Sequence, residues 1–113
     1  MNGIGGNTKA IIQVVKSAEK NAIGETVEQW EDVQTLNGWL DLSGGDSSYT
    51  TYYAKVQEST HVFVSDYVPL DSRIKAETSR CIINGNRYDI TLIDNPMGLN
   101  AQLEIFLKYT GGR

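Results

Sequence analysis

The chain has 113 residues, 40% of them apolar and 21% charged, which fits one domain and excludes two of ordinary size. Ten basic and fourteen acidic side chains give a net charge of −4, which disfavours readout of DNA or RNA because such a surface repels phosphate. One cysteine and one histidine exclude an intrachain disulfide and a four-ligand Cys/His zinc site.

Two kinds of targeting segment are not expected. No stretch approaches the ~20 apolar residues that a membrane span needs. The first ten residues lack the apolar region of a secretory signal. We therefore expect a soluble protein with no membrane partner, in a reducing compartment or indifferent to redox.

The first third of the chain predicts an N-terminal arm followed by extended strands. Residues 1–8 are rich in Gly and Asn and carry no periodicity, which is typical of a flexible arm. The β-branched run 9–15 predicts a strand, and residues 21–24 predict a turn. Two further extended stretches, 25–33 and 35–42, are expected from alternation at period two.

The middle of the chain predicts one short helix inside a long inserted loop. Residues 43–48 break the strand pattern and offer Asp and Ser as helix N-caps. Large side chains then recur at i, i+3, i+4 and i+7, which indicates about two helical turns. Such a face packs on the barrel or forms a subunit interface, since Tyr is enriched in binding hot spots. The candidate interface residues are Tyr49, Tyr52, Tyr53, Val56 and Gln57.

The second half predicts three more strands and a tight hairpin. Residues 60–67 alternate cleanly, and residues 69–72 break that strand. Asn84-Gly85-Asn86 joins strands 80–83 and 87–93, because Asn-Gly supplies the positive φ angles of a hairpin turn. Tyr88, Ile90 and Leu92 are expected to form the apolar face of the second hairpin strand.

The last residues complete the predicted fold. Residues 95–98 turn the chain, 103–109 form a closing strand, and 111–113 fray. We expect a mainly β protein, a small β-barrel of about six antiparallel strands with one short helix in a long inserted loop. The barrel domain is expected over residues 9–110.

Catalytic residue patterns are weak in this sequence. His61 with Glu58 and Asp66 is one candidate metal trio, but a lone strand histidine is far more often structural. Ser65, His61 and Asp66 have the residue types of a catalytic triad, but no Gly-x-Ser-x-Gly elbow supports that interpretation. Cys81 lies in a predicted strand, where a buried hydrophobe is the favoured role. We expect no enzyme activity, no metal and no cofactor.

The positions of the two tryptophans and of an acidic run can also be predicted from the sequence. Trp30 and Trp39 are expected in or near the core, with an interface anchor as the alternative for one of them. The acidic run is interpreted as an exposed strand edge, where charge prevents unwanted pairing. Its members are Glu25, Glu28, Glu31 and Asp32.

Several segments, taken together in order and spacing, resemble the head-tail joining (head closure or head-tail adaptor) proteins of long-tailed bacteriophages. Residues 28–33 (EQWEDV) are similar to the TWEDV segment of that family. Residues 54–61 (AKVQESTH) and 71–74 (DSRI) resemble two further elements. Residues 84–90 (NGNRYDI) resemble the DGRVYNI hairpin. The resemblance extends over residues 9–109.

The resemblance implies a structural virion protein without catalysis. Such a protein would form a ring of six or twelve copies below the portal or its adaptor, close the DNA-filled head and hold the tail. Its partners would be other copies of itself, the portal or adaptor protein and a tail protein, and packaged DNA would pass through without specific recognition. It would be found in the virion at the head–tail interface, and in the host cytoplasm during assembly.

The expected mechanism is assembly itself. Head-to-tail association around a rotation axis closes a ring. Residues 1–8 and 43–59 are expected to order on contact with a neighbour. Two alternatives stay open: a tail-completion or tail-terminator ring protein, and a small β-barrel module that binds nucleic acid or a peptide. The second would need a basic groove with exposed aromatic residues.

Overall fold

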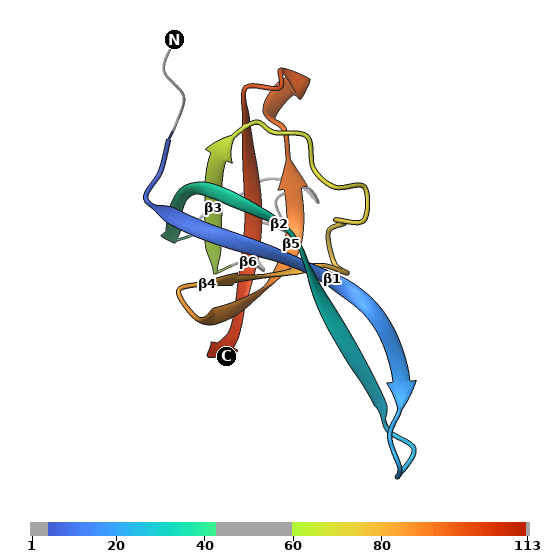
Figure 1. The fold of residues 1–113 in the computed structure, drawn as a ribbon. Coiled ribbons are helices and arrows are strands. Elements are labelled where there is room, and N and C mark those ends of the chain that lie inside the picture. Colours follow the sequence, from blue (N-terminus) through green and yellow to red (C-terminus); the bar gives the residue numbers. More distant parts are fainter. Residues whose placement is uncertain (1–4, 43–59, 113) are drawn as a thin grey trace, which may run out of the picture.

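Six antiparallel strands close into a barrel in the order β1-β2-β3-β6-β5-β4 (Figure 1). The computed structural model describes residues 5–42 and 60–112. Within them, no helix is long and apolar enough to cross a membrane. The elements are β1 (Thr8–Lys20), β2 (Thr26–Leu42), β3 (His61–Asp66), β4 (Arg80–Ile83), β5 (Asn86–Asp94), a 3₁₀ turn η1 (Pro96–Gly98) and β6 (Gln102–Gly112).

This architecture confirms the predicted mainly β barrel of about six strands. The predicted helix and the candidate interface residues Tyr49, Tyr52, Tyr53, Val56 and Gln57 lie outside the described residues. The 21–24 turn and the hairpin at Asn84-Gly85 are present as expected. Asn84 and Gly85 have φ angles of 53° and 81°, as a type I′ turn requires.

One long strand replaces the two stretches expected over 25–33 and 35–42. Ile12 pairs with Gln34 and Gln13 with Asp32, so Val33 is an extra residue on β2. This β-bulge bends the strand without ending it. Val33 packs, partly buried, against the core. The bulge therefore lets β2 continue beyond the barrel as a single strand.

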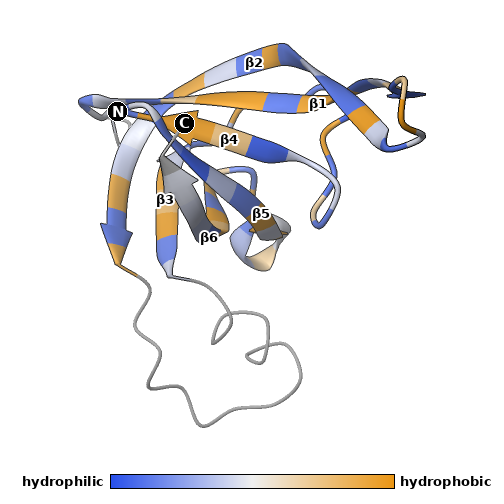
Figure 2. Cartoon of the chain, turned by 90° about the horizontal axis from the view of Figure 1, so that it is seen from below, coloured by the Kyte–Doolittle hydropathy of each residue, from blue (hydrophilic) through white to orange (hydrophobic). Residues whose placement is uncertain are grey.

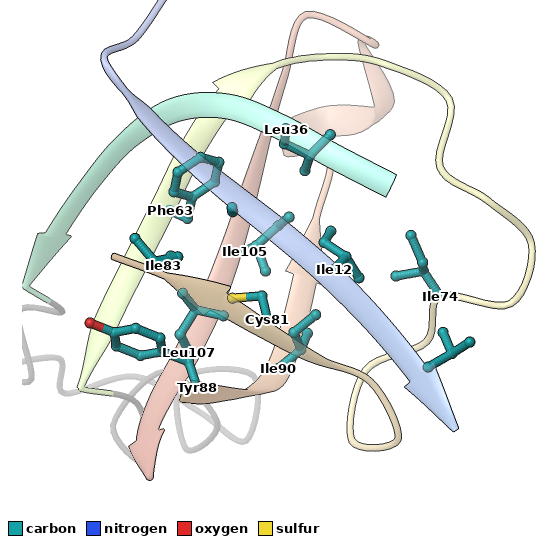
Figure 3. Packing of buried hydrophobic residues seen from close by; sticks show 12 residues of the cluster. Ile12, Leu36, Phe63, Ile74, Cys81, Ile83, Tyr88, Ile90, Ile105 and Leu107 are labelled. Carbon is teal, nitrogen blue, oxygen red and sulfur yellow. The ribbon is translucent and has the colours of Figure 1, made fainter. Parts of the chain in front are cut away.

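The core fills the inside of the barrel, where alternate side chains of each strand point. Figure 2 shows long orange stretches on β1 and β4, and a mixture of orange, pale and blue residues along β2 and β3. Among the described residues, twelve form one buried cluster (Figure 3): Ala10, Ile12, Val14, Leu36, Phe63, Ile74, Cys81, Ile83, Tyr88, Ile90, Ile105 and Leu107.

The prediction that Leu92 belongs to the apolar face of β5 is wrong. Ile90 pairs with Leu107, but Leu92 pairs with Phe106, so Thr91 is an extra residue on β5. The Thr91 hydroxyl donates to the Phe106 carbonyl oxygen at 3.0 Å. The bulge reverses the alternation beyond it, and Ile93 packs against the core in place of Leu92.

The connection from β3 to β4 covers part of the barrel. It contributes the buried Ile74 to the core. Arg73 donates two hydrogen bonds of 2.9 Å to the Asp71 carboxylate. These side-chain bonds, with a further bond from the Arg73 backbone, lower the pKa of Asp71 to about 2. Gln34 of β2 donates to the Pro69 carbonyl oxygen and accepts from the Asp71 backbone N–H, which ties the connection to β2.

Candidate interaction surfaces

The described residues of the candidate metal trio and of the candidate Ser-His-Asp triad do not come together in the structure. His61 and Asp66 lie at opposite ends of β3, roughly 17 Å apart along an extended strand. Ser65 points into the barrel, is 2% exposed, and donates to the Asp66 carbonyl oxygen at 3.0 Å. Glu58 lies outside the described residues. Within the described part of the chain, no three His, Cys, Asp or Glu residues form a group able to hold a metal ion.

Among the described residues, the largest projecting feature is a two-stranded hairpin, residues 15–29, which we call the hairpin arm. The β1–β2 ladder continues to Lys20 and Thr26. In contrast, β1 pairs with β4 only at Ile11–Gln13, and β2 with β3 only at Gly38–Leu42. Figure 1 shows the resulting arm extending away from the barrel. All its residues except Ser17 are exposed.

The tip of the hairpin arm is held by its own hydrogen bonds. The Asn21 side-chain oxygen accepts from the backbone N–H groups of Ile23 and Glu25, both at 3.0 Å. The Asn21 backbone donates to the Glu25 carbonyl oxygen at 2.8 Å. This fixed tip presents Ile23 with 78% of its surface exposed. An ordered tip loses little conformational entropy when it binds a partner.

Trp30 lies on the outside of the sheet, which contradicts the expected core position. The Arg80 guanidinium stacks on its ring, 4.0 Å from the ring centre. Arg80 Nε also donates to Gln13 Oε1 at 2.8 Å, and Gln13 Nε2 donates to Asp32 Oδ1 at 2.6 Å. These contacts join β2, β1 and β4 across the outer surface at the base of the hairpin arm.

A groove next to this network is basic with an apolar centre, and we call it the arginine groove. Its lining residues are Gln13, Arg80, Ile82, Gly85 and Arg87, and its volume is about 420 Å³. Burial and, second, the positive charge of Arg87 lower the pKa of Arg80. The carboxylates of Asp89, which pairs with Arg80 across β4 and β5, and of Glu28 act on this pKa in the opposite direction, so the positive charge of the groove is partly offset.

The β5–β6 connection presents a second apolar projection. Met97 and Leu99 are 90% and 68% exposed. Asn95 and Asn100 lock the loop: Asn95 Nδ2 donates to Asn100 Oδ1 at 2.7 Å, and the Asn100 backbone N–H donates to Asn95 Oδ1 at 3.0 Å. Met97 has a φ of 57°, which is strained for a residue with a side chain. A rigid loop with exposed apolar side chains is suited to docking.

An apolar row also crosses the outside of β3, β6 and β5. Val62 pairs with Phe106, which pairs in turn with Leu92. Trp39 of β2 lies beside Val64 and is 46% exposed, so its expected core position is wrong as well. The core positions of β2 are taken by its other face, at Leu36 and Gly38.

The hairpin arm, the arginine groove and the β5–β6 loop were not among the residues expected at an interface. One signal was available: residues 16–22 and 24–29 contain no large aliphatic side chain apart from Val27, while charges are frequent. Such a stretch cannot line a core, and only its residues 25–29 fall within a predicted strand. The predicted residues between 49 and 57 lie outside the described residues, and their role stays a prediction.

A family model described as phage head completion protein matches residues 1–109. The chain belongs to this family. It is therefore a structural protein of the phage head that takes part in head closure, and a component of the virion. A comparison with curated proteins gives no match.

A solved structure supports the fold of this phage head completion protein. The chain is similar to the solution structure of protein SF1141 from Shigella flexneri 2a, with a TM-score of 0.64 and 22% identity. The alignment covers 96% of each chain. At this identity the likeness concerns the barrel fold alone.

Proposed function

We propose that this phage head completion protein assembles as a ring at the head–tail interface, below the portal or its adaptor. There it closes the filled head and forms the platform to which the tail binds. The observation that carries the proposal is the family match over residues 1–109, which covers nearly the whole chain. The pattern of exposed surfaces supports the same role.

A subunit in such a ring needs contacts in several directions, and the surface offers them. A closed barrel has no free sheet edge, so contacts must use projections or side-chain surfaces. The hairpin arm and the apolar β5–β6 loop belong to different connections and project separately (Figure 1). One can contact a neighbouring copy while the other contacts the head or the tail.

The charge of the chain is compatible with DNA passing through the ring. A net charge of −4 gives no general attraction for phosphate. DNA held in or released through such a ring meets little electrostatic trapping. Apart from the arginine groove beside Trp30, the charge of the chain favours a passage over a nucleic-acid-binding module.

The test is a complementation of filled heads that lack this chain. Purified protein is added, and nuclease-resistant DNA and tail joining are both measured. We expect the protein to restore both, and electron microscopy to show a ring between portal and tail. Heads that retain DNA and join tails without the protein would refute the proposal. Protein that binds isolated tails but not heads would favour a tail-completion role.

A further inference from the structure

We propose that the hairpin arm of one copy docks, through the face that carries Glu19 and Val27, into the arginine groove of a second copy. The inference rests on the proposed ring and names the contact that builds it. Acidic and apolar groups on the arm would meet basic and apolar groups in the groove.

The hairpin arm and its base carry most of the net charge of the chain. Between residues 15 and 32 there are two lysines and five acidic residues, a balance of −3 out of a total of −4. The arginine groove has the opposite sign: Arg87 pairs with Ile82, and Arg80 lies two residues before Ile82 on β4, where Asp89 pairs with it and offsets part of its charge. Complementary charge of this kind sets orientation and speeds encounter.

The two faces of the hairpin arm differ in chemistry. Glu19 pairs with Val27, while Ala18 pairs with Glu28. Neighbouring pairs in a ladder point to opposite faces, so Glu19 and Glu28 lie on different sides. The face of Glu28 also carries Lys20, which offsets its charge. The face of Glu19 combines a carboxylate with a valine that is 39% exposed, and it is the one that matches the groove.

The arginine groove is prepared to accept a carboxylate. Arg80 and Arg87 line the same groove, and the charge of Arg87 is, after burial, the second cause that lowers the pKa of Arg80. An incoming carboxylate would replace this repulsion by two attractions. At Gly85 a side chain would meet nothing within 4 Å, so the end of the groove is open. Ile82 provides an apolar floor for Val27.

A second copy is the occupant because, within one chain, Arg80 contacts Trp30 and feels the charge of Glu28, which lie on the other face of the arm from Glu19 and Val27. In Figure 1 the hairpin arm and the β4–β5 turn extend to opposite sides of the barrel. A two-stranded hairpin is marginal in water and presents unpaired strand edges, so it gains stability from a partner. Two different patches in contact form a heterologous interface, and this closes a ring when the rotation permits.

Charge reversal on filled heads tests the contact. Glu19→Lys and Arg87→Glu should each reduce head-bound protein by about tenfold or more, because one reversal leaves two like charges in contact. Lys20→Glu, on the opposite face of the same arm, and Lys75→Glu, outside the groove, are the controls and should change the amount of head-bound protein less than about twofold. The double variant Glu19→Lys/Arg87→Glu should regain binding, because the pair is restored with its signs exchanged. Thermal melts check that each variant is folded.

A disulfide measurement identifies the partner. In Glu19→Cys/Arg87→Cys, oxidation of protein on heads should give a ladder of covalent multimers, whereas each single variant gives dimers at most. Cys81 is buried and does not compete.

Wild-type binding by Glu19→Lys, or absence of the ladder while heads are still closed, would overturn the inference and leave the proposed function standing. Loss with Glu19→Lys but not with Arg87→Glu would assign the arm to another protein. Wild-type protein that does not close heads would instead refute the proposed function.

Discussion

Cys81 shows how burial decides the chemistry of a single residue in this chain. It is 1% exposed, in the middle of the core cluster (Figure 3). Burial, together with the negative charge of Asp89, raises the pKa of its thiol to about 12. A thiol that stays protonated at neutral pH is a poor nucleophile. The residue therefore acts as a small apolar group, the role expected from its strand position.

Thiol chemistry and pH dependence both test this assignment. The native protein should react with a thiol reagent at pH 8 only at the rate at which it unfolds, while the denatured chain reacts at once. Since the pKa is raised from 9.0 to about 12 on folding, the unfolded chain loses its proton first. The free energy of unfolding should therefore fall as pH rises from about 9 towards 12. Cys81→Ala should remove this part of the slope, and fast native labelling would contradict the assignment.

The two tryptophans show where residue-level reasoning reaches its limit. Both were expected in or near the core because of their apolar area, yet both lie on the outer surface of β2. Trp30 is covered by the Arg80 guanidinium and Trp39 is 46% exposed. Alternation divides a strand into two faces but does not say which one a barrel encloses. Leu36 and Gly38 on the same strand occupy the inner face.

At the scale of elements, Gly38 permits the close approach of β2 and β3. A side chain there would overlap the Val64 carbonyl oxygen and lie 2.9 Å from Phe63 Cζ. Phe63 is itself 1% exposed, so it has no free space to move into. The absence of a side chain at this position is thus required by packing and not by a turn.

Gly38→Ala should lower the free energy of unfolding by about 1–3 kcal/mol, as expected for overpacking against a fixed backbone. Chemical denaturation followed by fluorescence measures this. The neighbouring Asn37→Ala, at an exposed position, should stay within about 0.5 kcal/mol of wild type. An unchanged denaturation midpoint for Gly38→Ala would mean that the two strands separate more easily than the core suggests.

The β5–β6 loop is an element whose shape does not depend on the core. Replacing Met97 and Leu99 together by Ser should leave the melting temperature nearly unchanged, because both side chains are already in water. We expect the same variant to join heads and tails less efficiently in the complementation assay, since an apolar contact would be lost. Met97→Leu keeps the apolar surface and should behave like wild type. Full joining by the double Ser variant would show that the loop has no docking role.

At the scale of the whole molecule, the barrel and the hairpin arm are separable. Replacing residues 16–29 with Asn-Gly would join Val15 and Trp30, which already pair, by a two-residue turn. No residue of the core cluster is removed. The shortened protein should therefore still unfold in one cooperative transition, measured by circular dichroism.

The same shortened protein should fail to close heads, because it lacks the surface proposed to reach the next copy. A control chain with the arm intact and Lys20→Glu should close them. Head closure by the shortened protein would show that the arm is dispensable. Loss of the cooperative transition would show instead that the arm contributes to the stability of the barrel.

The sequence by itself determined the class of the fold, most of the strands, the Asn84-Gly85 turn and the family resemblance. These depend on local signals: alternation at period two, β-branched runs and residues that accept positive φ. The bulges at Val33 and Thr91 were not predictable in this way, because an extra residue is tolerated only where the partner strand and the core accommodate it.

Only the tertiary structure decided which faces are enclosed and which are left for partners. Closing the barrel places Arg80 of β4 beside Gln13 of β1, 67 positions away, and gathers the arginine groove from three strands. It also leaves the ends of β1 and β2 without a third strand, which makes the hairpin arm. Neither surface has a local signature, since each exists through pairings between residues that are far apart in the chain.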